Sequence, residues 1–203
     1  MSDVASVDAA VAGGADYLGF VIFPKSPRHV SPAEAGALAR RKGSAKSVAV
    51  LVDPTEPQLG AVLRDMKPDY IQLHGGESPK RCLDARHYAE HGVWKALGVS
   101  TAKDLDPVEA YRDYVDGFLF DAKPPKDADR PGGLGTAWDF SLLKGFDPGA
   151  PWLLAGGLNP ENVADAVRQS DAPGVDVISG LESSPGVKDI EKIKAFFAAV
   201  RGV

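Results

Sequence analysis

Residues 152–163 read Trp152-Leu153-Leu154-Ala155-Gly156-Gly157-Leu158-Asn159-Pro160-Glu161-Asn162-Val163, and this stretch decides the fold. Its apolar start predicts a short buried strand, and its glycine pair predicts a tight turn. Asn159 is a favoured helix N-cap and Pro160 fits the first helical position, so a helix is predicted next. A strand, a turn and a helix in this order form the repeating unit of a parallel sheet covered by helices.

The glycine turn also predicts an anion site. Gly156-Gly157 has no Cβ, so a phosphate can approach the backbone N–H groups near a helix terminus. Ser179-Gly180 forms a second small-residue turn after the apolar run 175–178. In barrels of alternating strands and helices, phosphate binds where the loops after the last two strands meet. An ordinary tight turn is the alternative for either loop alone, and the pairing of the two favours phosphate.

The same alternation extends outward along the chain. Apolar runs predict seven strands, each followed by a helix, which favours a parallel sheet with right-handed crossovers. The resulting fold class is α/β, a (β/α)8 TIM barrel that lacks one strand, and the missing strand is expected before Asp3. The 203 residues lie at the lower edge of the usual length for this fold, so a single domain over residues 1–203 is predicted.

Composition narrows the functional class. The chain is 44% hydrophobic and 25% charged, with a formal net charge of −5, which argues against nucleic acid or an anionic membrane as a partner. Its one cysteine, Cys82, excludes an internal disulfide framework. Neither a signal peptide nor a run of roughly 18 or more apolar residues is evident, so a cytoplasmic location is predicted.

Several segments together resemble one known family, phosphoribosylanthranilate isomerase. They occur in the family's order over essentially the whole chain: Gly14-Ala15-Asp16-Tyr17-Leu18-Gly19-Phe20, Phe23-Pro24-Lys25-Ser26-Pro27-Arg28-His29-Val30-Ser31-Pro32, Ile71-Gln72-Leu73-His74-Gly75, Phe120-Asp121, residues 156–163, and Val175-Asp176-Val177-Ile178-Ser179-Gly180. The resemblance implies an Amadori rearrangement in tryptophan biosynthesis. It implies a small phosphorylated substrate and neither cofactor nor metal, and it leaves monomer or homodimer open.

Asp121 matches the general acid of this family. An aspartate has a reference pKa of about 3.9, so acid catalysis near neutral pH requires a raised value, which an apolar barrel mouth supplies by desolvation. The alternative is a turn aspartate that accepts backbone N–H groups. The position of Asp121 at the carboxyl end of a strand favours catalysis.

The resemblance also implies the substrate contacts. Arg28 matches the residue that binds the anthranilate carboxylate, for which a planar guanidinium offers a bidentate fit, and a solvated loop arginine is the alternative. His74 and Asp176 match positions that line the site, although a lone histidine is more often structural. The phosphate-binding backbone carries over to Gly156, Gly157, Ser179 and Gly180.

Two segments depart from the family pattern. Leu134, within the glycine-rich stretch 131–135 expected to form a lid, stands where a small polar residue is expected. The family's first strand ends in Lys-Ile-Cys-Gly, whose cysteine is the general base, and this motif is absent from the printed sequence. Cys82 is no substitute, because it lies inside a predicted outer helix.

Three explanations remain open for the missing motif: a misplaced start, a shortened chain and a non-catalytic relative. The chain as printed is expected to lose the ~10²-fold to 10⁴-fold that an acid–base group contributes. The alternative function is therefore a phosphosugar-binding barrel without catalysis. A metal-dependent epimerase is a third reading, but of the four histidines only His74 lies at a predicted strand end.

Overall fold

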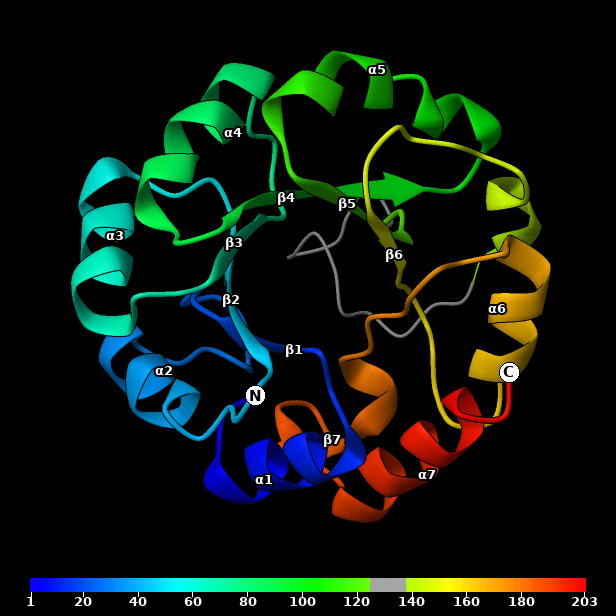
Figure 1. Ribbon diagram of the computed structural model, residues 1–203, viewed down its shortest axis with the longest axis horizontal. Coiled ribbons are helices and arrows are strands. Elements are labelled where there is room, and N and C mark those ends of the chain that lie inside the picture. The colour runs from blue at the N-terminus through cyan, green and yellow to red at the C-terminus, as the bar shows by residue number, and fades with distance from the viewer. Residues whose placement is uncertain (125–137) are drawn as a thin grey trace.

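A curled sheet of parallel strands forms the centre of the molecule, and helices cover its outer face (Figure 1). This computed structural model describes residues 1–124 and 138–203, so the expected lid at residues 131–135 lies outside the described residues. The strands are β1 (Tyr17–Val21), β2 (Lys46–Leu51), β3 (Tyr70–Leu73), β4 (Gly92–Val99), β5 (Gly117–Ala122) and β6 (Trp152–Leu154). They are hydrogen-bonded in sequence order, which confirms the expected α/β barrel class.

The apolar run after Gly174 pairs more briefly than predicted. Leu154 and Val175 form an isolated parallel bridge, in which Leu154 N donates to Gly174 O at 3.0 Å and Asp176 N donates to Leu154 O at 2.8 Å. Residues 175–178 therefore occupy a seventh strand position without forming a full strand, because β6 itself has only three residues.

A cavity of about 760 Å³ lies between this seventh position and β1. Tyr17, Trp152, Val175 and Phe197 are among the residues that line it. At the edge of β1, the α-amino group of Met1 donates to Gly19 O. The cavity therefore lies along the edge of β1.

The helices begin largely where capping residues predict. They are α1 (Val4–Gly13), α2 (Pro32–Ala39), α3 (Glu56–Ala61), α4 (Pro79–Ala85), α5 (Val108–Tyr111), α6 (Val163–Ser170) and α7 (Ile190–Val200). Ser31 and Glu34 form the expected capping box of α2, and Asp189 caps α7 by accepting from Glu191 N and Lys192 N. None of the helices in the described ranges is long and apolar enough to cross a membrane.

Helix α6 begins later than the sequence predicts. Asn162 is its N-cap, whereas Asn159 and Pro160 precede the helix. The side chain of Asn159 accepts from Glu161 N and Asn162 N, and Asn162 Oδ1 accepts from Asn159 N at 2.8 Å. These bonds hold residues 159–162 as a separate turn, so the helix begins only at Val163.

The first and last helices pack against each other and close the helical ring (Figure 1). Gly13 of α1 lies beneath Phe197 of α7, and an added Cβ would come within 2.2 Å of that ring. Arg201 Nη2 donates to Gly13 O at 2.7 Å. This contact joins residues 188 positions apart in the sequence.

Aromatic rings cluster near the amino ends of the strands. Tyr17 opens β1, Tyr70 opens β3, and both rings contact Trp94, with centroids 5.5 and 6.0 Å from its ring. Beyond them, a small apolar cluster contains Ala96, Leu119 and Ala155. In barrels of this class the ligand site lies at the carboxyl ends of the strands, so the site is expected at the opposite end from these rings.

A small antiparallel hairpin that the sequence analysis did not predict lies over one edge of the barrel mouth. It consists of β7 (Glu182–Ser184) and β8 (Val187–Lys188). Gly186 turns the chain with φ of +86°, and an added Cβ there would lie 2.5 Å from Pro27 O. The hairpin therefore packs directly on the loop that carries Arg28.

Candidate active site

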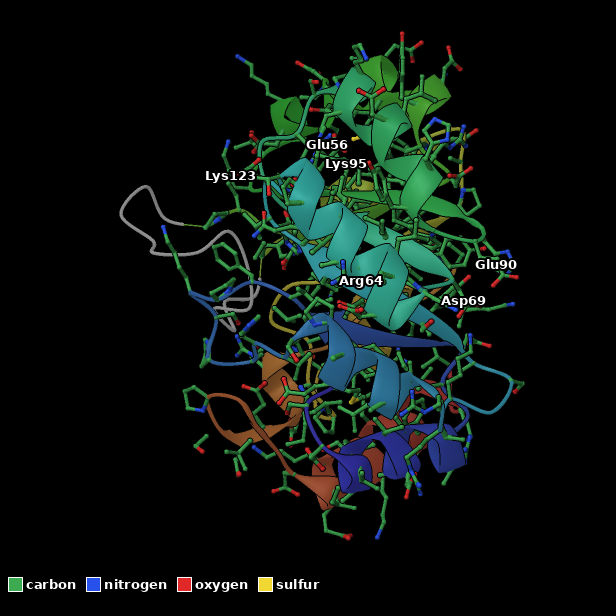
Figure 2. The ribbon with its side chains drawn as sticks, turned by 90° about the vertical axis from the view of Figure 1, so that its left-hand side faces the viewer. Glu56, Arg64, Asp69, Glu90, Lys95 and Lys123 are labelled. Carbon is green, nitrogen blue, oxygen red and sulfur yellow. The ribbon has the colours of Figure 1, made fainter. Side chains whose placement is uncertain are left out.

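The predicted site residues gather at the carboxyl ends of the strands. Asp121 lies near the end of β5, His74 follows β3, and Asp176 follows the bridge at Val175. Figure 2 shows the two ends of the barrel, with Lys123, which follows β5, on one side and Asp69 and Glu90 on the other. The site therefore lies at the end on which Lys123 lies.

Asp121 and His74 contact each other across this end. Asp121 Oδ2 lies 3.2 Å from His74 Nε2, and the two side chains are only 10% and 11% exposed. Asp121 Oδ1 accepts from Ala122 N at 2.8 Å, so the carboxylate also makes the turn contact considered as its alternative role. Gln72 Nε2 lies 3.1 Å from His74 Nδ1. An amide nitrogen only donates, so Nδ1 accepts, and the ring proton lies on Nε2, facing Asp121.

Asp176 adds a second carboxyl group to the same electrostatic environment. Burial raises the pKa of Asp176, and the charge of Asp121 raises it further, while His74 and Lys188 act in the opposite direction. Burial and the charge of Asp121 therefore both favour the protonated form of Asp176. This arrangement is typical of sites that handle protons.

Arg28 forms a bidentate ion pair with Glu182 of the hairpin. Its Nε and Nη2 atoms lie 2.7 and 2.8 Å from the two carboxylate oxygens, and both side chains are nearly buried. Burial alone would raise the pKa of Glu182, but the hydrogen bonds from Arg28 and the charges of Lys188 and Arg28 together outweigh it, and the pKa lies below its usual value. If Arg28 binds a ligand carboxylate, it does so while its Nε and Nη2 atoms are hydrogen-bonded to Glu182.

Lys188 lies beside this pair, with Nζ 3.3 Å from Glu182 Oε1. Burial lowers the pKa of Lys188 below its usual value, although Glu182 acts against the shift. Arg28, Asp176, Glu182 and Lys188 all line one cavity inside the barrel mouth. Positive and negative groups thus alternate around the space where a ligand would lie.

The two glycine turns predicted to bind phosphate lie against each other. Gly156 and Gly157 have φ of +89° and +68°, values that glycine adopts readily. An added Cβ at Gly156 would lie 2.4 Å from Ala122 N, and one at Gly180 would lie 1.9 Å from Leu158 O. The Ser179-Gly180 turn therefore touches the loop that follows β6, which brings the two predicted halves of the phosphate site together.

Sequence reasoning missed three side chains of this site: Gln72, Glu182 and Lys188. Gln72 was visible as a polar residue in the apolar run of β3, where alternation directs it inward with His74. Glu182 and Lys188 gave no comparable signal, because the hairpin that brings them to Arg28 is only a few residues long.

Cys82 has no part in this site. It is fully buried in α4, and burial raises the pKa of its thiol to about 11. A protonated thiol on the outer layer fits the structural role expected for it.

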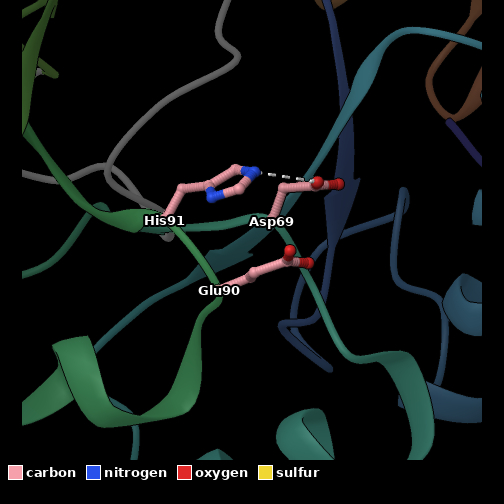
Figure 3. Close-up of side chains that lie close together, drawn as sticks. All are labelled: Asp69, Glu90 and His91. Carbon is pink, nitrogen blue, oxygen red and sulfur yellow. Dashed lines mark ion pairs between the residues drawn. The ribbon is translucent and has the colours of Figure 1, made fainter.

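A second cluster of ligand-type side chains, Asp69, Glu90 and His91, lies at the amino end of the barrel (Figure 3). Asp69 is buried, and its Oδ2 accepts from both N and Oγ of Ser47 at 2.7 Å. Lys42 and Lys46 also form ion pairs with Asp69. The lysines compensate the carboxylate and would compete with a cation for its oxygens. The cluster therefore joins β2 to β3 and lies far from Asp121.

Comparison with known proteins assigns the family. A profile of the family N-(5'-phosphoribosyl)anthranilate (PRA) isomerase matches residues 1–199. The N-(5'-phosphoribosyl)anthranilate isomerase of Mesorhizobium japonicum is 48% identical over 194 residues, which are 95% of this chain and 89% of that protein.

Solved structures give the same result. The crystal structure of phosphoribosyl anthranilate isomerase from Thermotoga maritima superposes on this chain with a TM-score of 0.88 and 33% sequence identity. The match covers 100% of this chain and 96% of that one. A further isomerase structure, in complex with reduced 1-(o-carboxyphenylamino)-1-deoxyribulose 5-phosphate, has a TM-score of 0.85 and 31% identity over the same shares of both chains. These relatives are isomerases by name and give no support to a barrel without catalysis. The chain belongs to the N-(5'-phosphoribosyl)anthranilate isomerase family.

Proposed function

We propose that this chain catalyses the Amadori rearrangement of N-(5'-phosphoribosyl)anthranilate to 1-(2-carboxyphenylamino)-1-deoxyribulose 5-phosphate, a step of tryptophan biosynthesis. The observation that carries this proposal is the Asp121–His74 contact of 3.2 Å at the carboxyl ends of the strands. Asp121 is the general acid that protonates the ribose ring oxygen as the ring opens. Its carboxyl group lies at the end of a barrel strand and contacts His74, which is where a proton donor to the substrate has to lie.

The remaining residues bind the substrate at its two charged ends. The guanidinium of Arg28, oriented by Glu182, binds the anthranilate carboxylate. The backbone N–H groups of Gly156-Gly157 and Ser179-Gly180 bind the phosphate. His74 and Asp176 line the space between these ends, where the ribose carbons react. The distance between the charged ends fixes the orientation of the substrate, which lowers the entropic part of the barrier.

The reaction also requires a base that takes the C2 proton. The family resemblance places that base on the cysteine of a Lys-Ile-Cys-Gly strand.

The proposed function also has a partner, a cellular location, a domain organisation and an oligomeric state. The partner is a small phosphorylated molecule rather than nucleic acid or a membrane, and the location is the cytoplasm. Residues 1–203 act as one domain, supported by the packing of α1 on α7 and by a main apolar core shared by most elements. The oligomeric state is either a monomer or a homodimer.

The decisive experiment follows turnover of N-(5'-phosphoribosyl)anthranilate by the loss of anthranilate fluorescence. Two forms are compared: the chain of 203 residues, and the same chain joined to a strand ending in Lys-Ile-Cys-Gly. Turnover that Asp121→Asn abolishes in an active form supports the proposal. Binding of a phosphorylated product analogue without turnover in both forms would contradict it.

A further inference from the structure

Lys95 is a charged residue buried in the layer between the sheet and the helices. It lies in the otherwise apolar strand β4, and its side chain is 2% exposed (Figure 2). Its Nζ atom donates to Gly75 O at 2.7 Å and to Glu77 Oε2 at 2.9 Å, and lies 3.4 Å from Leu73 O. All three acceptors belong to the end of β3 and the loop that follows it.

Glu77 completes this clamp from the loop side. Its carboxylate, 1% exposed, accepts from Gly75 N at 2.9 Å and from Asp53 N at 2.8 Å. Asp53 in turn accepts from Gly76 N at 2.8 Å, and the Glu77 carbonyl accepts from the hydroxyl of Tyr111 at 2.8 Å. The polar atoms of residues 75–77 are thus fixed by side chains from three other parts of the chain.

The clamped loop carries His74. The backbone N–H of His74 donates to Leu51 O at 2.8 Å, and its ring faces Asp121. Strand β4 also contacts Asp121, because its residue Gly98 pairs with Asp121 on β5. Lys95 lies three positions before Gly98 on the same strand. Lys95 therefore links the loop of His74 to the strand that sets the position of Asp121.

A buried ion pair of this kind is a poor source of stability. Removing two charges from water costs several kcal/mol per ion, and apolar replacements of similar volume are often neutral or stabilising. The contribution of the pair is to hold the loop after β3 in one conformation, since each of its hydrogen bonds forms only in that conformation.

We propose that the buried Glu77–Lys95 pair is a positioning device that holds His74 in line with Asp121. This inference rests on the proposed function, in which Asp121 is the acid. Neither Glu77 nor Lys95 touches the substrate, because both side chains are buried between the sheet and the helices, whereas the substrate lies within the barrel. They act by fixing the backbone between Leu73 and Glu77.

Two variants separate positioning from stability. Lys95→Met removes the ammonium and leaves Glu77 buried without its cation, whereas Glu77→Gln combined with Lys95→Met removes both charges. We expect the double variant to melt close to the parent chain, while its kcat falls by about 10-fold to 100-fold and its KM changes by about 2-fold or less. The control is Lys80→Met, which makes the same chemical change in the exposed Lys80–Asp84 pair of α4.

A spectroscopic readout keeps this inference separate from the proposed function. The ring signals of His74 in nuclear magnetic resonance spectra should shift in both Lys95 variants and stay fixed in Lys80→Met, whether or not the protein turns over. In the parent chain, the amide protons of Gly75 and Gly76 should exchange slowly with solvent. Rapid exchange of these amides, or parental kcat and parental His74 signals in the double variant, would overturn the inference.

Discussion

Glu182 binds both Nε and Nη2 of Arg28 across 154 positions of sequence, and this contact fixes the hairpin to the loop after β1. The pair has a chemical consequence, because two hydrogen bonds to one carboxylate hold the plane of the guanidinium in one orientation. The orientation of Arg28 toward a ligand therefore depends on a residue of the hairpin.

Replacing Glu182 by Gln should weaken both stability and substrate binding. At pH 7 we expect the free energy of unfolding to fall by about 3 kcal/mol, since the change removes the buried carboxylate that forms two hydrogen bonds with the guanidinium of Arg28. The pKa of Glu182 is lowered in the folded state, so its contribution is complete above its unfolded value of about 4.5 and is lost as pH falls through the folded value. Urea unfolding of both proteins at pH 7 and below pH 4 should show the difference shrinking on acidification. A difference that does not change with pH would contradict this account.

Asp121→Asn should remove the general acid while leaving the fold intact. The side chain keeps its size, so we expect KM to change little and kcat to fall by about 10²-fold to 10⁴-fold. Steady-state kinetics with the fluorescent substrate measures both. Asp84→Asn, in the exposed pair of α4, is the matched control and should retain parental kinetics.

Gly180→Ala should separate the two turns of the phosphate site. The added methyl group would lie 1.9 Å from the carbonyl oxygen of Leu158, so the backbone has to move. We expect KM to rise by about 10-fold or more and inorganic phosphate to inhibit less well, since a 1 Å displacement disturbs bonds of this kind strongly. Gly60→Ala is the control, because nothing lies within 4 Å of its added Cβ, and helix propensity predicts a gain of up to about 1 kcal/mol. An unchanged KM in Gly180→Ala would count against a phosphate site there.

Asp69→Asn should affect stability alone. Burial would raise the pKa of Asp69, but the hydrogen bonds from Lys42 and Ser47 outweigh it and hold the pKa well below its usual range. We expect a loss of about 3 kcal/mol at neutral pH, shrinking in strong acid, with kcat and KM unchanged. Thermal unfolding together with steady-state kinetics tests this expectation, and a loss of activity in folded protein would contradict a purely structural role.

The strand–turn–helix rhythm and the position of Asp121 could be predicted from sequence because both depend on neighbouring residues. Hydrophobic runs set the strands, and Asp121 is the first charged residue after the apolar run that ends at Phe120. The predicted start of α6 was wrong by three residues. Asn159 and Asn162 form hydrogen bonds with each other and make a separate turn, which N-cap preferences alone do not predict.

The contacts that orient the site were beyond sequence reasoning because they join distant residues. Glu182 reaches Arg28 only through a hairpin too short for periodicity to reveal. Lys95 did carry a signal, since a lysine within a buried strand requires a partner, but nothing local identifies that partner as Glu77. The roles of the site residues stay predictions until kinetics tests them.

The packing of Gly13 against Phe197 and Arg201 has a consequence for folding during synthesis of the chain. Translation adds residues at about 5 to 20 per second, so roughly 10 to 40 s separate the synthesis of these contact partners, which lie 188 positions apart. During that interval α1 lacks the contacts that α7 supplies in the folded chain. The ring of helices can therefore close only after the last helix has been synthesised.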